Sequence, residues 1–444
     1  MLKVVKFGGS SLADSKQFKK VKDIVTADDS RRIVVVSAPG KRDKTDSKVT
    51  DLLYLCHAHL KYGVSYKPTF DMIEERFNDI YEGCGLTCDL EPEFAKIRSR
   101  MNKDMSIDYL VSRGEYLSAI LMADYLGYHF VDAKDVVFFN YDGKINLEKS
   151  YEAISKKLAQ YERLVIPGFY GSLPNGKVKT MSRGGSDISG SIAAAAIDAT
   201  IYENWTDVSG ILMADPRIVD SPKPIERITY GELRELAYMG ADVLHEDAIY
   251  PVRDKQIPLN IRNTNMPDNK GTLIMESFDE KEQSEEERNR FITGISGRRN
   301  FSIISVYKNR VSSEAKLMRD VLLVFQNYDI NIETTLSGID CFSVVVSTEK
   351  VKEYIYDIVE EIKAACSPEE VKVMENISLV ATVGRKMMYR PGVSGRVFNA
   401  LGDQNINIRM ISQGADEISI TVGVDNRDFE KTIKLLYNSF VTNN

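Results

Sequence analysis

Two glycine-rich stretches of the chain combine residue types that can bind an anion. The first, VVKFGGSS, places Lys6 at the end of an expected strand and follows it with Gly8, Gly9 and two serines. Glycines let backbone N–H groups approach an oxyanion closely, and the lysine adds a mobile positive charge. The stretch lacks the Walker A pattern, so a strand-ending turn explains it about as well as a phosphate site does.

The second stretch, KTMSRGGSDISGS, carries Arg183, two glycines, Ser186 and Asp187 immediately before the alanine-rich run SIAAAAIDAT. Backbone N–H groups at a helix N-terminus, together with an arginine, make an anion site. The simpler interpretation is that Ser186 or Asp187 caps the helix that the alanine-rich run predicts, with the glycines forming the turn. Taken alone, the stretch favours the cap.

Two further stretches carry carboxylates, hydroxyls and an arginine. VSRGE puts Glu115 in the first turn of the helical pattern GEYLSAILMADYLG, where the helix dipole favours a carboxylate in any case. NWTDVSGILMADPR carries Thr206, Asp207 and Arg217 among turn-forming residues, and turn chemistry alone accounts for Asp207. No single stretch therefore identifies a site.

The elements around these stretches predict how they are positioned. Strand-like runs (LKVVKF, RRIVVVSAP, RLVIPGFYG, ATIYENWTDVSGI) alternate with helical runs such as SLADSKQFKKVKDIV and VTDLLYLCHAHLKYG. This alternation predicts an α/β domain with a mainly parallel sheet. In such sheets ligands bind outside the carboxyl ends of the strands, where Lys6, Gly8 and Gly9 are expected.

The C-terminal part of the chain repeats itself beyond a charged stretch, SFDEKEQSEEERNR, which marks a domain boundary. DINIETTLSGIDCFSVVV from Asp329 aligns with NINIRMISQGADEISITV from Asn405, and each copy follows a short strand and a helix. The chain therefore carries two copies of a small βαβ-type unit. Because this part has no dense cluster of catalytic residue types, we expect it to serve binding, regulation or assembly.

The composition excludes several classes of protein. A net charge of −7 argues against a nucleic-acid-binding surface. The N-terminus reaches glycines too early for a signal peptide, and no apolar run approaches the ~18 residues of a membrane helix. Five cysteines, an odd number, suit a reducing compartment, and Cys56 with its neighbours His57 and His59 lacks zinc-site spacing. We expect a cytoplasmic protein without a protein-held metal, membrane or nucleic-acid partner.

The combination of stretches is more specific than any one of them. VVKFGGSS, SRGE, SRGGSD, WTDVSGI…DPR and NTNMPDNKGTLI occur in this order in the aspartokinases of the amino-acid-kinase superfamily, which the chain resembles from about Leu2 to Phe440. The C-terminal pair resembles the two ACT domains that these enzymes use for amino-acid feedback. VSAPGKRDKTDSKVTDLL and LSGID further resemble the monofunctional branch common in Gram-positive bacteria.

The resemblance implies a fold, a domain division and a reaction. The fold is an α/β amino-acid-kinase domain with a mainly parallel sheet, followed by two α+β, ferredoxin-like ACT domains. The ranges are a catalytic domain at 1–276, a charged linker at 277–298, and ACT domains at 299–374 and 375–444, the second partly nested with the first. The reaction transfers the γ-phosphoryl of ATP to the β-carboxylate of L-aspartate, giving 4-phospho-L-aspartate for lysine, threonine and methionine biosynthesis. Mg²⁺ is expected to be held mainly by ATP and water, in a homodimer or dimer of dimers.

The resemblance also assigns residues to each ligand. Residues expected at the transferred phosphoryl are Lys6, Gly8, Gly9 and Asp187, the last binding the substrate ammonium or orienting the lysine. Residues expected at aspartate are Thr50, Glu115, Arg183 and Ser186, with Arg183 on a carboxylate and Glu115 on the ammonium. Residues expected at the nucleotide are Ser10, Ser37, Thr206, Asp207 and Arg217. Residues expected at an amino-acid effector, lysine first and threonine as an alternative, are Met318, Asp320 and Ser337.

Two positions depart from the family pattern near the nucleotide. Asp242 stands where the family has a lysine close to the phosphates, and Leu212 stands where many members have a tyrosine. A carboxylate cannot do the work of that lysine, so Arg253 and Lys255 are candidates to compensate. The alternatives to an aspartokinase are another amino-acid kinase, such as an acetylglutamate or glutamate kinase, and a non-catalytic amino-acid sensor on the same fold.

Overall fold

The structure is a computed structural model that describes residues 1–182, 184–241, 244, 246–279, 290–309 and 315–442. The chain forms two compact units. The first unit consists of Met1–Ile211, Pro224–Tyr230 and Val243–Asp279. The second unit consists of Leu212–Lys223, Gly231–Asp242 and Glu280–Asn444. No helix of the described residues is long and apolar enough to cross a membrane.

The first unit is built on an eight-stranded, mainly parallel sheet, as the alternation of strands and helices predicted. The strand order is β10-β12-β11-β7-β1-β2-β4-β3, and only the β11–β12 pair is antiparallel. The strands are β1 (Lys3–Phe7), β2 (Arg31–Val36), β3 (His129–Phe130), β4 (Leu164–Pro167), β7 (Ile201–Thr206), β10 (Arg227–Thr229), β11 (Leu259–Asn263) and β12 (Thr272–Met275).

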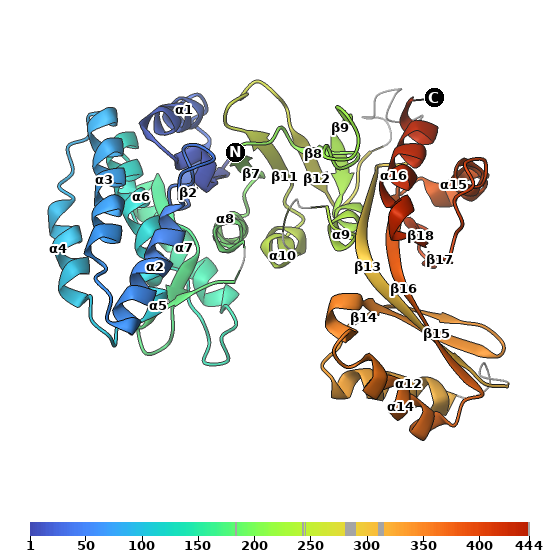
Figure 1. Ribbon diagram of the computed structural model, residues 1–444. Coiled ribbons are helices and arrows are strands. Elements are labelled where there is room, and N and C mark those ends of the chain that lie inside the picture. The colour runs from blue at the N-terminus through green and yellow to red at the C-terminus, as the bar shows by residue number, and fades with distance from the viewer. Residues whose placement is uncertain (183, 242–243, 245, 280–289, 310–314, 443–444) are drawn as a thin grey trace. The chain divides into compact units, whose positions relative to one another are not determined.

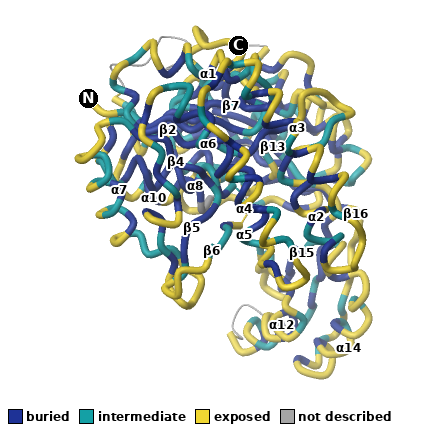
Figure 2. The backbone as a smooth tube through the Cα atoms, turned by 90° about the vertical axis from the view of Figure 1, so that its left-hand side faces the viewer, coloured by how far each residue is buried: buried dark blue, intermediate teal, exposed yellow. Residues whose placement is uncertain are grey.

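The central strands are buried on both faces, which explains their nearly continuous apolar sequence. Val4, Val5, Ile33 and Val34 are fully buried, and β2, β4 and β7 run through the interior (Figure 2). A parallel sheet covered on both faces requires such runs of β-branched residues, because neither face meets water. The polar residue Lys6 is therefore an exception within β1, where Val4, Val5 and Phe7 surround it.

Helices cover both faces of this sheet (Figure 1). α8 packs against α7 and α10 and covers β1, β2 and β7, whereas α6 packs against α1, α2 and α3 and covers β2 and β4. The helices are α1 (Ser15–Thr26), α2 (Val49–Tyr62), α3 (Lys67–Cys84), α4 (Glu91–Arg100), α5 (Ile107–Val111), α6 (Arg113–Leu126), α7 (Leu147–Tyr161), α8 (Gly185–Ala196) and α10 (Glu246–Asp254). Two small two-stranded sheets complete this part of the chain: β5 (Tyr170–Ser172) with β6 (Val178–Thr180), and β8 (Ile211–Leu212) with β9 (Pro224–Ile225).

The second unit contains one antiparallel six-stranded sheet shared by both sequence repeats. Its order is β14-β15-β13-β16-β18-β17. The strands are β13 (Gly294–Tyr307), β14 (Ile332–Ser337), β15 (Cys341–Ser347), β16 (Glu370–Val383), β17 (Met410–Gln413) and β18 (Ser419–Asp425). The helices are α9 (Tyr230–Tyr238), α12 (Ala315–Asn327), α13 (Thr348–Val351), α14 (Ile355–Cys366), α15 (Val393–Gly402) and α16 (Phe429–Tyr437).

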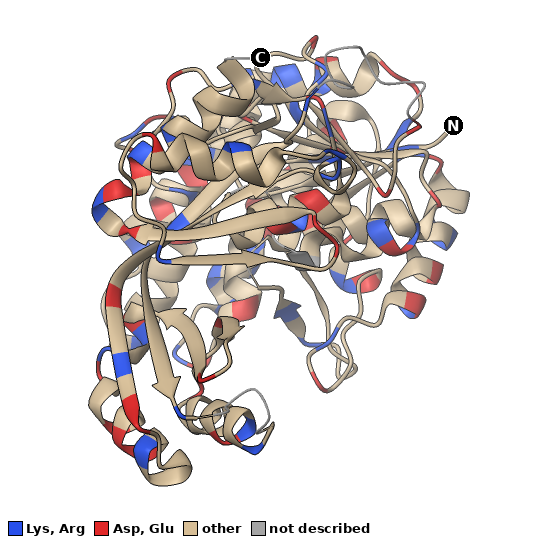
Figure 3. Ribbon diagram, turned by 90° about the vertical axis from the view of Figure 1, so that its right-hand side faces the viewer, with Lys and Arg blue, Asp and Glu red and all other residues tan. Residues whose placement is uncertain are grey.

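The two long strands β13 and β16 each serve both repeats. The half of β13 from Phe301 to Tyr307 pairs with β15 and with the start of β16. The other half, Gly294 to Arg298, pairs with the end of β16, which also pairs with β18. The expected α+β repeats are therefore present, but no single residue separates them, and the division at 374/375 stays a prediction. Lys, Arg, Asp and Glu are interspersed along the helices (Figure 3).

Two segments within the range 1–276 pack with the second unit. In the first of these segments, Met213 O accepts a hydrogen bond from Ile295 N (2.7 Å). In the second, Glu232 of α9 is fully buried and accepts hydrogen bonds from Thr293 Oγ1, Arg385 N (2.9 Å) and Arg385 Nη1 (2.8 Å). The alternation of strands and helices gave no reason to separate these segments from the first unit.

Candidate active site

The carboxyl ends of the parallel strands meet at one edge of the first unit's sheet. Phe7 of β1 lies opposite Val36 of β2 and Trp205 of β7. The loops that follow these strands are tied together, since Gly8 N donates to Trp205 O (2.9 Å) and Ser37 N donates to Phe7 O (3.2 Å). This edge is where the sequence placed the first glycine-rich stretch and Ser37.

Lys6 lies at this edge with its ammonium paired. Its side chain is buried, and its Nζ lies 2.5 Å from Asp187 Oδ1 and donates to Asn204 Oδ1 at 3.4 Å. Asn204 Nδ2 in turn donates to Asp187 Oδ1 (2.9 Å). Lys6 and Asn204 are 198 positions apart in the sequence, yet they form one cluster with Asp187. The three residues come from β1, β7 and α8. Whether Asp187 orients Lys6 or binds the substrate ammonium stays a prediction, and the ion pair supplies the contact that the first role requires.

The predicted N-cap at Ser186 or Asp187 is wrong. α8 begins at Gly185, and its N-cap is Gly184, whose φ of 75° lies in the left-handed region that favours glycine. Ser186 and Asp187 therefore lie in the first turn of the helix, which starts earlier than the alanine-rich run indicated. The carboxylate of Asp187 is available to Lys6 because it does not cap the helix.

Gly9 is explained by close backbone packing. A Cβ atom on Gly9 would lie 2.9 Å from Ala38 O, and Gly9 O accepts a hydrogen bond from Gly40 N at 2.8 Å. A Cβ on Gly8 would meet only ordinary contacts within the protein, including Lys6 Nζ at 3.7 Å. Gly8 therefore borders the space beside the lysine ammonium, whereas Gly9 is required by the fold.

Glu115 is a buried carboxylate close to the same edge. It lies in the first turn of α6 with a side chain that is almost completely buried, and its Oε2 has no hydrogen-bond partner among the described residues. Burial raises the pKa of Glu115 to about 8, against hydrogen bonds from the Ala38 and Glu115 backbones and the charge of Arg113. A buried carboxyl with an unsatisfied oxygen is suited to receive a cationic group of a ligand.

The neighbouring segment holds Thr50 near Glu115. Gly114, just before Glu115, packs against Ala38 and the α2 residues Val49 and Leu53. Thr50 follows Val49 in the first turn of α2 and is half-buried. The first turns of α2 and α6, which carry Thr50 and Glu115, therefore pack together beside the loop that follows β2.

The nucleotide residues assigned to the first unit lie after β1 and β7. Ser10 is half-buried in the 3₁₀ turn Gly9–Leu12. Thr206 ends β7, and its hydroxyl donates to Asp207 Oδ1 (3.1 Å), while Asp207 O accepts from Asn263 Nδ2 (3.2 Å). Asp207 is exposed, so its carboxylate is open to a ligand.

Two other positions singled out in the sequence belong to the second unit, and two lie outside the described residues. Arg217 belongs to the second unit, where its guanidinium forms a two-point contact with Asp215, with distances of 2.9 and 2.6 Å. Leu212 belongs to the same unit. Arg183 and Asp242 lie outside the described residues.

The two candidates to compensate for Asp242 lie away from this edge. Arg253 and Lys255 stand at the end of α10 and just before β11, whose first residue Leu259 is opposite Tyr202 near the start of β7. They are therefore at the amino ends of the strands. Lys255 Nζ pairs with Asp198 Oδ1 (3.0 Å) and Arg253 lies 3.7 Å from Glu276. The hypothesis that they bind the phosphates is contradicted by this position.

The effector residues lie in the first ACT repeat. Met318 packs against the apolar core formed by α12, α14 and the sheet. Asp320 of α12 is paired with its neighbour Arg319 (2.7 Å), and Ser337 ends β14 in an exposed position. Met318 therefore contributes to the apolar core of the first ACT repeat, which is the simpler explanation for a methionine at this position.

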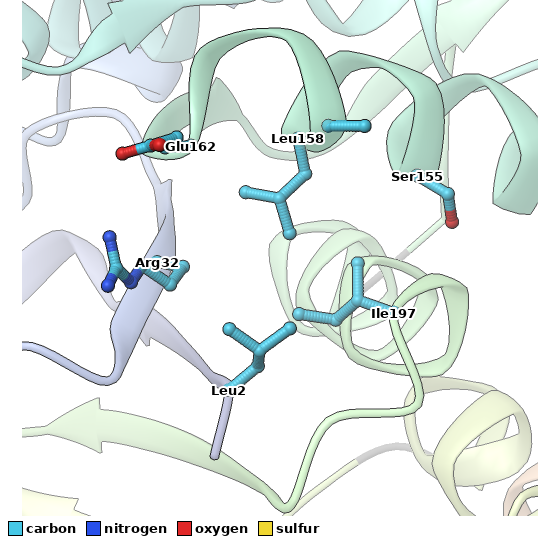
Figure 4. A pocket seen from close by; sticks show the side chains of 7 residues that line it. Leu2, Arg32, Ser155, Leu158, Glu162 and Ile197 are labelled. Carbon is cyan, nitrogen blue, oxygen red and sulfur yellow. The ribbon is translucent and has the colours of Figure 1, made fainter.

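A separate pocket of about 500 Å³ lies elsewhere in the first unit (Figure 4). The side chains of Leu2, Leu158 and Ile197 point into it, and Arg32 and Glu162 stand at one side. None of the residues assigned to the reaction lines this pocket. The site at the carboxyl ends of the strands is therefore distinct from it.

Sequence reasoning missed Asn204 and Arg76. Asn204 lies within the strand-like run ATIYENWT, which shows no motif at that position. The alternation of side chains along a strand is the only signal, because it places Asn204 on the same face as Tyr202 and Thr206. Arg76 of α3 is buried and donates to Gly40 O (2.9 Å) and to Asp46 (2.6 Å), which anchors the loop after β2. A helical arginine gives no sequence signal for such a contact.

Comparisons with known proteins place this geometry in a family. Residues 1–263 match the amino acid kinase family, and residues 380–440 match the ACT domain. The chain is 33% identical to aspartokinase 3 of Bacillus subtilis over 99% of its own length and 98% of that protein. The chain is an aspartokinase family member.

Solved aspartokinase structures share the whole fold. The aspartate kinase of Clostridium acetobutylicum is 46% identical, with a TM-score of 0.88 and 99% coverage of both chains. Two structures of Escherichia coli aspartokinase III, each 25% identical over 99% of both chains, have TM-scores of 0.75 and 0.73. The first contains aspartate and ADP in the R-state, and the second contains lysine and aspartate in the T-state. The kinase unit and both ACT repeats are therefore common to these proteins and this aspartokinase.

Proposed function

We propose that this enzyme transfers the γ-phosphoryl group of ATP to the β-carboxylate of L-aspartate, giving 4-phospho-L-aspartate and ADP. The observation that carries the proposal is the Lys6–Asp187 ion pair at the carboxyl edge of the sheet, together with the buried Glu115 carboxylate, which is hydrogen-bonded to the Ala38 backbone in the loop after β2. Family relatives bind aspartate and ADP. The relationship extends over the whole chain, including both ACT repeats, which favours aspartate kinase over another amino-acid kinase.

Phosphoryl transfer demands alignment and neutralisation of negative charge, and it needs no covalent enzyme intermediate. A β-carboxylate oxygen of aspartate attacks the γ-phosphorus, and the bond to the β,γ-bridging oxygen breaks as ADP leaves. Lys6, with the backbone N–H group of Gly9, stabilises the charge on the transferred group. The N–H group of Gly8 donates to Trp205 O, so Gly8 contributes the open space beside the Lys6 ammonium. Mg²⁺ accompanies ATP and is held mainly by phosphate oxygens and water, as is usual for this ion.

The amino-acid substrate is held by opposite charges. Its ammonium faces Glu115, whose Oε2 lacks a protein partner among the described residues. Thr50 in the first turn of α2 and Ser186 in the first turn of α8 are assigned to the substrate for their hydroxyl groups. Arg183 is assigned the remaining carboxylate on the sequence pattern alone, because a planar guanidinium suits two-point carboxylate binding.

The nucleotide contacts are assigned to the loops after β1, β2 and β7. Ser10, Ser37, Thr206 and Asp207 lie in or beside these loops. Arg217 belongs to the second unit, and its assignment to the nucleotide rests on the sequence pattern alone.

The ACT repeats are proposed to bind an amino-acid effector, with lysine as the first choice and threonine as the alternative. Asp320 supplies a carboxylate for the effector ammonium. Met318 and Ser337, in the same repeat, are assigned to the same effector site. An effector acts only through different affinities for active and inactive states. Inhibition of turnover by added lysine but not threonine, lost in Asp320→Ala, supports this choice; inhibition by threonine alone reverses it.

We propose an assembly from the family expectation and a compartment from the state of the thiols. A homodimer or dimer of dimers is proposed, and its mass is measurable by light scattering. All five cysteines are free, as expected in the reducing cytoplasm.

The direct test is aspartyl hydroxamate formation with ATP, Mg²⁺, aspartate and hydroxylamine. We expect product with aspartate and none with glutamate or acetylglutamate. Lys6→Ala should lower kcat about a hundredfold or more, because a charge-assisted contact to the transferred group is lost. Lys16→Ala, an exposed lysine of α1, is the matched control. A folded wild-type protein that makes no product would support a sensor in place of a kinase.

A further inference from the structure

Asn204 connects the two charged groups at the centre of the site. It is 4% exposed, and each end of its amide contacts one partner. Its Oδ1 accepts from Lys6 Nζ (3.4 Å), and its Nδ2 donates to Asp187 Oδ1 (2.9 Å). We propose that Asn204 is a positioning residue for phosphoryl transfer, which fixes Lys6 and Asp187 relative to each other. This inference rests on the proposed function of the site.

The sheet register explains why Asn204 reaches both groups. Lys6 of β1 and Asn204 of β7 are directly paired, so their side chains lie beside each other on one face of the sheet. The first turn of α8 brings Asp187 to that face. On the other side of Asn204 the paired residue is Ile261 of β11, which is apolar. The charged groups facing Asn204 are therefore Lys6 and Asp187.

Tyr202 supports the same arrangement from the same face of β7. Its hydroxyl donates to Asp187 O (3.1 Å), and its ring is completely buried against α8. A Cβ on Gly190 would lie 2.3 Å from the Tyr202 hydroxyl, so that glycine lets the ring reach α8. Tyr202 holds the backbone of Asp187 while Asn204 holds its carboxylate.

The amide has a chemical task that an apolar side chain cannot perform. An ammonium has three N–H donors, and Asp187 and Asn204 take two of them. These two acceptors define where the remaining N–H points, and Gly8 borders that space. Asp187 Oδ1 accepts from both Lys6 and Asn204, so the amide also restrains the carboxylate. The lysine is thereby held ready for a phosphoryl oxygen at no cost of reorganisation during the reaction.

The test compares two substitutions of Asn204 with a control on a neighbouring strand. Asn204→Leu has a similar volume without polar atoms, and Asn204→Asp keeps an acceptor but cannot donate unless it is protonated. Asn260→Leu is the matched control, because Asn260 lies on β11 opposite Glu203 and its Oδ1 has no hydrogen-bond partner among the described residues. Full-length variants are assayed for kcat, for both KM values and for melting temperature.

We expect Asn204→Leu to lower kcat about 10- to 100-fold, because a misplaced catalytic group costs this much, with both KM values changing less than about threefold. The activity of Asn204→Asp, relative to wild type at each pH, should rise as the pH falls from 8 to 6. Its introduced carboxyl beside Asp187 takes up a proton, and it can then donate to Asp187 as the amide does. Asn204→Leu should show no such recovery, and Asn260→Leu should retain wild-type kcat.

Two outcomes would contradict the positioning role of Asn204 and leave the proposed function intact. One is an Asn204→Leu enzyme with unchanged kcat. The other is a loss of activity that follows a loss of melting temperature, with no acid recovery in Asn204→Asp, which would show a structural role only. If wild type itself forms no aspartyl hydroxamate, the proposed function fails first.

Discussion

Lys6 and Glu115 are two buried charged residues in opposite electrostatic situations. The Lys6 ammonium has a carboxylate 2.5 Å away, so its charge is compensated within the protein. Glu115 has no such partner for Oε2, and its pKa is raised to about 8. The Lys6 ammonium can stay charged in the buried site and bind a phosphoryl group, because Asp187 balances its charge. The Glu115 carboxyl has no such counter-charge on Oε2 among the described residues, so a cationic ligand favours its ionised form.

Glu115 predicts that aspartate binding depends on pH. The substrate ammonium requires the ionised carboxylate, whose population grows as the pH rises toward about 8. The KM for aspartate should therefore fall about fiftyfold between pH 6 and pH 8, because the ionised fraction of a single group with a pKa of about 8 rises from about 1% to about 50%. Steady-state kinetics measure this, with Glu115→Gln as the comparison, whose KM should be high and independent of pH.

The same residue gives a prediction for the unliganded protein. A carboxyl whose pKa is raised on folding adds stability that is present below its unfolded pKa and is lost as the pH rises through the folded value. The free energy of unfolding should thus decrease between about pH 4.5 and pH 8 in wild type. Urea denaturation should show a smaller decrease in Glu115→Gln; identical pH profiles would contradict the raised pKa.

Gly8 and Gly9 are adjacent but should respond differently to alanine. Gly9→Ala places a Cβ 2.9 Å from Ala38 O, which should cost about 1–3 kcal/mol of folding free energy. Gly8→Ala meets only ordinary contacts, so its stability should stay within about 0.5 kcal/mol of wild type. Its methyl group borders the space beside Lys6 Nζ and should lower kcat about tenfold or more. Thermal unfolding and the hydroxamate assay separate the two effects, and equal losses of stability would refute the distinction.

At the scale of elements, two helices carry the important polar contacts. α8 brings Asp187 to Lys6, and α9 brings Glu232 to Thr293 and Arg385. Each helix carries a carboxylate that forms an ion pair with a residue of another element, in addition to its apolar packing. The position of each helix is therefore fixed by a specific polar contact as well as by burial.

Glu232→Gln tests the contact made by α9. Glu232 is fully buried and forms a 2.8 Å ion pair with Arg385. Removing its charge should destabilise the second unit by about 2–3 kcal/mol, because a buried charge network loses one partner. Guanidinium denaturation measures this. Glu276→Gln, whose partner Arg253 lies 3.7 Å away at the surface, should change stability by less than about 1 kcal/mol.

At the scale of the whole molecule, the two units are interleaved along the chain. The polypeptide leaves the first unit at Leu212–Lys223 and again at Gly231–Asp242, and both segments pack with residues of the second unit. Lys223 N donates to Tyr437 Oη (2.8 Å), which joins residues 214 positions apart. The kinase sequence is therefore not a separate folding unit from the ACT repeats.

This interleaving predicts the behaviour of a truncated chain. A protein ending at residue 279 lacks Thr293, Arg385 and Tyr437, so the buried carboxylate of Glu232 loses the hydroxyl and guanidinium donors of the full chain, and Lys223 N loses its acceptor Tyr437 Oη. We expect it to aggregate or to unfold without a sharp transition, with at least about tenfold less activity than the full chain. Circular dichroism and the hydroxamate assay check this. A stable, fully active, effector-insensitive fragment would show that the interleaved segments need no second unit.

Much of the fold was readable in the sequence, because its patterns are local. The β-branched run of β2 and the helical period of α1 each specify their element within about a dozen residues. The repeat after Asp329 likewise predicted two similar α+β units. The sharing of β13 and β16 was not predictable, since strand pairing joins residues about 60 to 90 positions apart.

The same distinction between local patterns and contacts distant in sequence applies to the candidate site. The sequence by itself determined the family and the residue types, since Lys6, Glu115 and Asp187 stand in motifs that specify phosphoryl transfer to an amino acid. The tertiary structure decided that Asp187 pairs with Lys6 and does not cap α8, that Arg253 and Lys255 lie at the wrong ends of the strands, and that Asn204 joins the cluster. Distances between side chains on different elements follow from sheet register and helix packing. No local pattern in a sequence contains them.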